Sequence, residues 1–279
     1  RDRSPSRGLG DVYKRQIQTI ALFFMMGMGM FGQGFVGKLA FPSANVSDRL
    51  EKTFTSVNFN MMIMVIYALI TIAIFGMWYY ARYEGNFLPS PKKTFNPMML
   101  AAIVILVPGT QFAANFIANL TGYIRPDWLQ QYNELFETSG ITDTTFVTVL
   151  YSVILAPICE ELIFRGVTMR CAIKALPFAL ANLMQAALFG LFHLNWIQGI
   201  YAFALGIVLG YVCECGGSIY YSIGLHLLFN LWGTLSGFFP DPGNSVVVFV
   251  IAVTIVSLAA GFVLFNKGRR KLPINSTGI

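Results

Sequence analysis

The sequence predicts an all-α polytopic membrane protein with about eight transmembrane helices in one bundle. Of its 279 residues, 56% are hydrophobic and only 11% are charged, whereas about 25% are charged in ordinary soluble domains. Its mean hydropathy is +0.62, and several apolar runs reach the roughly 20 residues that a helix needs to cross a bilayer. The eight candidate spans are residues 17–40, 59–82, 96–119, 145–171, 177–196, 198–213, 217–237 and 245–266.

The beginning of the chain differs in character from the apolar remainder. Residues 1–16 are polar, rich in arginine and without apolar periodicity, and they resemble translated adapter or cloning sequence. We therefore expect a non-native leader there. The rest divides into residues 17–144 with the first helices and loops, a core at 145–240 that carries the polar motifs, and residues 245–279 with the last helix and a basic tail.

Charge at the ends of the spans predicts the topology. Positive side chains favour the cytoplasmic side of a membrane, and with an even number of spans every basic cluster falls on that side. Both termini are then cytoplasmic, the acidic loop 120–144 is outside, and the chain is a multi-pass protein of the cell membrane. Because the net charge of +6 is spread over these ends, we expect no nucleic-acid partner. The basic clusters are Arg82 with Lys92 and Lys93, Arg165 with Arg170 and Lys174, and Lys267 with residues 269–271.

Cysteines and glycines within the spans favour packing roles. The four cysteines give no disulfide framework, and the Cys213–Cys215 pair lacks the partners of a zinc site. Gly206 and Gly210 are spaced as GxxxG, which lets two helices approach closely. Pro157 is expected to kink or end the fourth span.

Adjacent carboxylates and a guanidinium interrupt the fourth span at "CEELIFRG". Ionisable groups inside a membrane are costly and commonly functional. Glu161 and Arg165 are four residues apart and share a helix face, whereas Glu160 points about 100° away. Two interpretations are open: a buried structural ion triad, or a Glu161–Arg165 pair that leaves Glu160 unpaired and reactive.

Both histidines of the chain also lie within apolar runs. His193 closes "FGLFH", with Phe189 one helical turn earlier, and His226 opens "HLLFN", with Asn230 one turn later. Taken singly, His193 is explained as a packing residue and the His226–Asn230 pair as interhelical hydrogen bonding. By simple counting His193 lies well past the middle of a short span, so it can meet Glu160 only if the fourth span is long and tilted or the fifth is shallow.

Together these groups form a set that can activate water. Glu160, aided by His193, can act as general base and later give the proton to a leaving amine. His226 and Asn230 can donate hydrogen bonds to the oxyanion of a tetrahedral intermediate. The alternative is a metal centre, because Glu160, His193 and His226 are together a zinc ligand set. The water mechanism needs no cofactor, and the residues leave the choice open.

The three motifs EExxxR, FxxxH and HxxxN, in this order, resemble those of the CPBP intramembrane protease family, also called the Abi or CAAX-protease family. The resemblance extends over about residues 148–237 and makes residues 145–240 the catalytic core. It implies an eight-helix bundle with a cavity open toward the cytoplasm. It also implies that Glu160 and His193 activate water, that His226 and Asn230 form the oxyanion hole, and that Glu161, Arg165 and Phe189 give structural support.

The leading functional prediction is a bacterial intramembrane endopeptidase that cuts a membrane-embedded peptide or protein. A role on prenylated CAAX substrates is less favoured, because bacteria generally lack them. The alternative within the same family is a non-enzymatic bacteriocin self-immunity or membrane scaffold protein. A transporter is disfavoured because the sequence has no inverted repeats. The sequence leaves the oligomeric state open.

Overall fold

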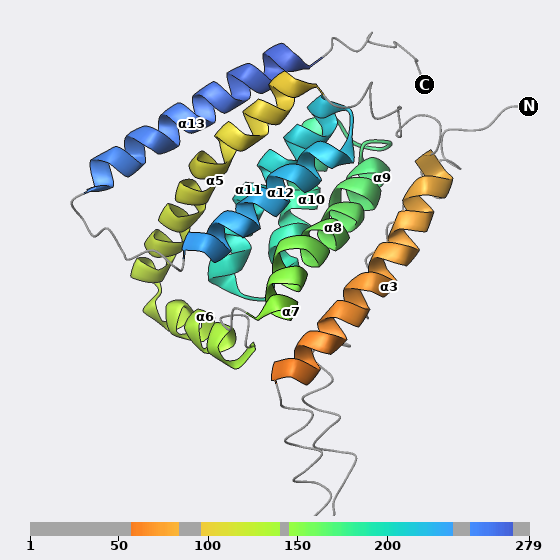
Figure 1. The fold of residues 1–279 in the computed structure, drawn as a ribbon. Helices are drawn as coiled ribbons and strands as arrows, with labels where there is room; N and C mark the ends of the chain where they lie inside the picture. Colours follow the sequence, from red (N-terminus) through yellow and green to blue (C-terminus); the bar gives the residue numbers. More distant parts are fainter. Residues whose placement is uncertain (1–56, 84–95, 140–144, 237–245, 270–279) are drawn as a thin grey trace, which may run out of the picture.

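The computed structural model describes residues 57–83, 96–139, 145–236 and 246–269. These residues form eight separate helices, and no strand occurs among them (Figure 1). The helices are α3 (Val57–Tyr83), α5 (Pro97–Ile124), α6 (Pro126–Ser139), a continuous helix from Phe146 to Ala172, α10 (Phe178–Phe192), α11 (Trp196–Gly216), α12 (Ile219–Ser236) and α13 (Val247–Gly268).

Five of the described helices are long and apolar enough to cross a membrane, and the chain is therefore a multi-pass membrane protein, as predicted. They are α3 from Met61, α5, the 146–172 helix, α11 and α13. The remaining predicted spans at 177–196 and 217–237 are also helices. However, α10 has only 15 residues, and in α12 the polar residues His226 and Asn230 interrupt the apolar run. The leader at 1–16 and the span at 17–40 lie outside the described residues.

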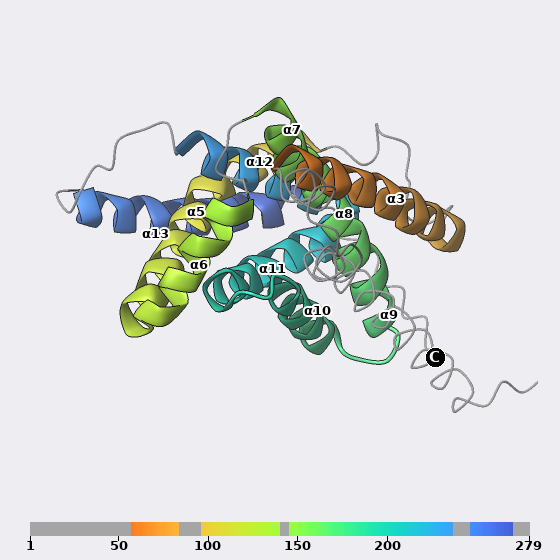
Figure 2. The same cartoon turned by 90° about the horizontal axis from the view of Figure 1, so that it is seen from below.

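The expectation of a plain loop at 120–144 is wrong, because α5 continues to Ile124 and α6 follows at once. Pro126 suits the first turn of a helix, where a missing N–H costs nothing. Trp128 and Tyr132, one turn apart, are both partly buried, and the Trp128 ring stacks on Trp196 of α11 at 5.3 Å. A search for membrane-length apolar runs passes over this 14-residue amphipathic helix. Figure 2 shows α6 beside α11, and α11 beside α10.

Arg170 and Lys267 lie at one end of the helix bundle, whereas Arg125 lies at the opposite end, where α5 meets α6. The C-terminal ends of α3, the 146–172 helix and α13 point to the same side of the bundle in Figure 1, and Arg170 and Lys267 lie near two of these ends. There Arg170 Nη1 pairs with Glu214 Oε2 at 2.5 Å, and Asn96 Nδ2 donates to the Gly268 carbonyl at 2.7 Å. Lys92, Lys93 and residues 270–271 of the predicted clusters lie outside the described residues, so the gathering of positive charge at one membrane face and its assignment to the cytoplasm stay predictions.

Helices α10 and α11 pack at backbone distance, as the GxxxG spacing predicted. A Cβ added to Gly206 would lie 3.1 Å from the Ala186 Cα, and one added to Gly210 would overlap the Asn182 side chain. Gly190 and Gly199 also face each other across the two backbones: a Cβ on Gly190 would lie 2.5 Å from the Gly199 carbonyl oxygen. The absence of side chains at these glycines therefore lets the two helices pack together.

Gly190→Ala is expected to destabilise the protein by about 1–3 kcal/mol, because the new methyl group meets backbone that cannot move aside. The matched control is Gly224→Ala on α12, where an added Cβ meets nothing within 4 Å. Thermal unfolding in detergent should therefore show a lower Tm for Gly190→Ala and an unchanged or raised Tm for Gly224→Ala. Equal Tm values would contradict the close α10–α11 packing.

Candidate active site

The 146–172 helix carries the two carboxylates and is not a uniform α-helix. It consists of α7 (Phe146–Val149), a π-helical segment η1 (Leu150–Leu155), α8 (Ala156–Glu161), a second π-helical segment η2 (Leu162–Met169) and α9 (Arg170–Ala172). Pro157 lies in the first turn of α8 and does not end the helix, in contrast to one of the two expectations for it. A proline has no N–H and clashes with the carbonyl four residues before it, and a π-turn relieves both problems.

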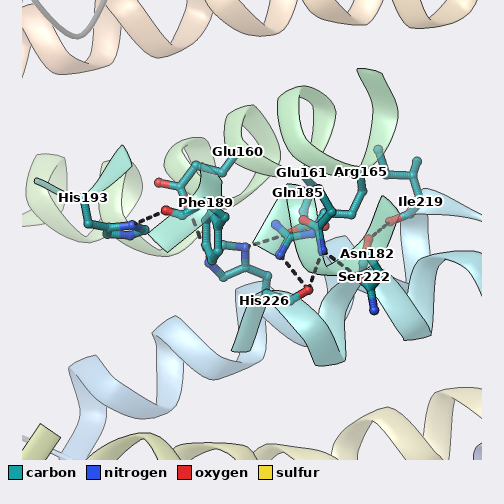
Figure 3. Close-up of polar contacts among 11 residues, drawn as sticks. Glu160, Glu161, Arg165, Asn182, Gln185, Phe189, His193, Ile219, Ser222 and His226 are labelled. Atoms are coloured by element: carbon teal, nitrogen blue, oxygen red, sulfur yellow. Dashed lines mark hydrogen bonds and ion pairs between the residues drawn. The ribbon is translucent and has the colours of Figure 1, made fainter. Parts of the chain in front are cut away.

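Glu161 and Arg165 form the predicted ion pair. The distance from Arg165 Nη1 to Glu161 Oε1 is 2.8 Å, and both side chains are fully buried. The guanidinium also lies 4.4 Å over the Phe189 ring and donates to the Gly206 carbonyl at 3.3 Å. The charge of Arg165 is therefore neutralised by Glu161 of its own helix, and its guanidinium is held in place by contacts with α10 and α11 (Figure 3).

His226 of α12 lies between the two carboxylates. Its Nδ1 is 2.9 Å from Glu161 Oε1, and its Nε2 is 3.6 Å from Glu160 Oε2. The expectation that Glu160 has no partner and that Glu161 serves Arg165 alone therefore needs correction. Because a carboxylate only accepts hydrogen bonds, Nδ1 of His226 carries the proton in this contact. Glu161 thus fixes the orientation of the imidazole that faces Glu160.

The two glutamates differ in access to a reacting molecule. The Glu161 side chain is completely buried, whereas 16% of the Glu160 side chain is exposed. In Figure 3 the Glu160 side chain extends toward His193 and His226, away from Arg165. Glu160 is accordingly the carboxylate that a water molecule and a substrate could reach.

His193 caps the C-terminal end of α10, and its hydrogen bond shows which ring nitrogen carries the hydrogen. Its Nδ1 lies 2.8 Å from the carbonyl oxygen of Phe189. A carbonyl cannot donate, so Nδ1 carries a hydrogen, and in the neutral ring Nε2 has a free lone pair. The Phe189 ring lies between the two imidazoles. It contacts both edge to face, with distances between ring centroids of 5.0 Å to His193 and 5.7 Å to His226.

The helix that carries Glu160 is long and the helix that ends at His193 is short, which is one of the conditions under which these two residues were expected to meet. The helix that carries Glu160 has 27 residues, whereas α10 has 15 and ends at Phe192. A short connection joins α10 to α11, and in it Leu194 has a φ of 54°; this left-handed conformation is uncommon for a bulky residue. Asn195 then caps α11 by accepting from the Gln198 N–H. The tight turn places His193 at the end of α10 opposite the basic end of the bundle.

Asn230 lies one turn after His226, as predicted, and contacts the helix of the carboxylates. Its Nδ2 donates to the Ser152 carbonyl in η1 at 2.8 Å. One amide hydrogen is used in this bond and one remains.

The arrangement does not fit a three-ligand metal centre. Among the described residues, no three His, Cys, Asp or Glu side chains are grouped so that they could hold a metal ion. In the zinc set of Glu160, His193 and His226, the imidazoles are separated by the Phe189 ring. The donor set therefore suits a mechanism of side chains and water better than a metal site.

Several side chains near these residues were not predicted from the sequence. Gln185 donates to the Gly206 carbonyl at 2.8 Å, beside Arg165. Its spacing of four residues from Phe189 was a usable signal, because Gln185, Phe189 and His193 share one face of α10. The hydroxyls of Tyr67, Tyr151 and Tyr201 lie within electrostatic reach of the Glu160 carboxylate. They come from α3, η1 and α11, and no spacing in the sequence links them.

Comparison with known proteins gives one family. Residues 142–232 match the model of the family described as type II CAAX prenyl endopeptidase Rce1-like. Neither the curated proteins nor the solved structures gave a match to the chain. The matched stretch begins just before α7, ends within α12, and includes both carboxylates, both histidines and Asn230. Residues 142–232 are thus an Rce1-like domain of the type II CAAX prenyl endopeptidase family.

Proposed function

We propose that the protein is an intramembrane endopeptidase that hydrolyses a peptide bond of a membrane-associated peptide or protein. The observation that carries this proposal is the accessible carboxylate of Glu160. It extends toward His193, an imidazole with a free Nε2 (Figure 3), and faces a second imidazole, His226, that is held by Glu161. Apolar helices surround this set, so its charges and hydrogen bonds act in a medium of low dielectric constant.

Water activation is assigned to Glu160 and His193. Glu160 takes one proton from the water as the water oxygen attacks the carbonyl carbon of the substrate. The Nε2 of His193 accepts a hydrogen bond from the second water proton and orients the nucleophile. When the tetrahedral intermediate collapses, the C–N bond breaks and Glu160 gives its proton to the departing amine.

Stabilisation of the oxyanion is assigned to His226 and Asn230. The remaining amide hydrogen of Asn230 and the Nε2 side of His226 are donors for the oxygen that becomes negative. For His226 this requires a proton on Nε2 as well as on Nδ1, and the two ring nitrogens face Glu160 and Glu161, respectively. Arg165 keeps Glu161 ionised and so supports the orientation of His226.

His193→Asn tests this proposal. The asparagine amide retains a donor for the Phe189 carbonyl but offers no basic nitrogen at the position of Nε2. We expect the variant to keep its Tm and to cleave about 10²–10⁴-fold more slowly. The measurement is cleavage of membrane-anchored peptides by the purified protein in proteoliposomes, with products identified by mass spectrometry.

Two outcomes would contradict the proposal. One is full activity in His193→Asn. The other is stoichiometric zinc in the purified protein that disappears in this variant, which would favour the metal centre. If the wild type cleaves no membrane-anchored peptide but protects cells against a peptide toxin, and His193→Asn protects equally, the immunity function is the correct one.

A further inference from the structure

One carbonyl in the helix of the carboxylates has lost both of its regular partners. In an α-helix the Ser152 carbonyl would accept from the N–H of Ala156, four residues on. That N–H instead bonds to the Tyr151 carbonyl, five residues before it, in the π-helical pattern of η1. The π-helical partner of Ser152 would be residue 157, which is a proline and has no N–H.

The side-chain amide of Asn230 supplies the missing donor. Its Nδ2 lies 2.8 Å from the Ser152 oxygen and comes from α12, 78 residues away in the sequence. Inside a membrane no lipid group can take the place of this donor, so an unpaired carbonyl there is costly. The hydrogen bond therefore fixes the amide plane of Asn230 and joins α12 to the helix of Glu160.

We propose that Pro157 is a positioning residue for Asn230. Because the proline has no N–H to donate to the Ser152 carbonyl, that oxygen is available to accept from the Asn230 amide. The amide is then held with its second hydrogen available to the reaction. Pro157 acts through the backbone, three residues before Glu160, and touches no reacting atom. Only its effect on catalysis rests on the proposed function; the hydrogen-bond exchange stands without it.

A double-mutant cycle on stability tests the exchange directly. Leucine has the same number of side-chain heavy atoms as asparagine, branched at the same carbon, but they are all apolar. Hydropathy alone therefore predicts a higher Tm for Asn230→Leu in a membrane protein. If the carbonyl depends on Asn230, the Tm falls instead, by about 5 °C. In a Pro157→Ala background the new N–H can bond to Ser152, and the same substitution should change the Tm by less than half as much.

The control for this cycle is Thr234→Val on the same helix. The Thr234 hydroxyl bonds to the Asn230 carbonyl of its own helix, so its loss should leave the Tm nearly unchanged in both backgrounds. Equal effects of Asn230→Leu in the two backgrounds would overturn the proposal. An unchanged or raised Tm of Asn230→Leu alone would also overturn it, even if Pro157→Ala gives no folded protein.

Steady-state kinetics test the positioning role. An oxyanion donor acts mainly in the transition state, so a displaced amide lowers kcat and leaves KM in place. Pro157→Ala is expected to lower kcat about 10-fold, a part of the 10²–10³-fold effect of losing a whole donor. Pro108→Ala removes a proline from inside α5 and should leave kcat unchanged. A rise in KM alone for Pro157→Ala would refute the positioning role while leaving the hydrogen-bond exchange and the endopeptidase function standing.

Discussion

Glu160→Gln is expected to reduce peptide-bond cleavage by at least about 10³-fold while the protein still inserts and folds. A glutamine has the shape of glutamate but cannot take a proton from water at neutral pH. Because Glu160 is assigned both proton transfers, as base in the attack and as acid in the collapse, the variant loses both contributions. The fold should survive, because the Glu160 side chain is partly exposed and its ion-pair contact with His226 is a long one, at 3.6 Å.

The matched control for this prediction is Glu214→Gln at the far end of α11. Glu214 is also a part-buried glutamate with a cationic partner, Arg170, and its described ion pair involves neither histidine. We expect it to retain cleavage activity even if its Tm falls slightly. Initial rates on the same membrane-anchored peptide, normalised to the amount of folded protein, give the comparison. Activity that survives Glu160→Gln would exclude Glu160 as the base.

Contacts within one helix were the part of the site that the sequence could predict. Glu161 and Arg165 are four residues apart, and this spacing alone places them on one face; the pair forms as expected. The contact of His226 with both glutamates depends on how α12 is rotated against α8. The spacing of residues within one segment does not determine the rotation of one helix relative to another. The sequence therefore predicted that these residues lie close together but not which of their atoms are in contact.

The long apolar elements were predictable for a similar reason, and the irregular ones were not. Hydropathy located α3, α5, α11 and α13 because a membrane-length apolar run has few alternatives. The amphipathic α6 is short and half polar, so the same criterion passed over it. The π-helical segments differ from α-helix only in which N–H meets which carbonyl, and Pro157 was the only sign of them in the sequence.

Arg165→Met is expected to destabilise the protein strongly, with a loss of about 3–5 kcal/mol. Methionine can fill much of the space, but it leaves the fully buried Glu161 without the cation 2.8 Å away, and breaking a buried pair on one side costs that much. The lost contact with the Phe189 ring adds to the effect. Thermal unfolding and the yield of monodisperse protein in detergent measure it.

The double variant Glu161→Gln/Arg165→Met separates the two roles of Glu161. Removing both charges of a buried pair is commonly neutral for stability, so the double variant should recover most of the Tm that Arg165→Met loses. It should still cleave poorly, because a neutral glutamine accepts more weakly from His226 Nδ1 than a carboxylate does and therefore orients the imidazole less firmly. A double variant that is no more stable than Arg165→Met would show that the arginine acts through Phe189 and Gly206 rather than through Glu161. Recovery of activity together with stability would show that the carboxylate of Glu161 has no part in orienting His226.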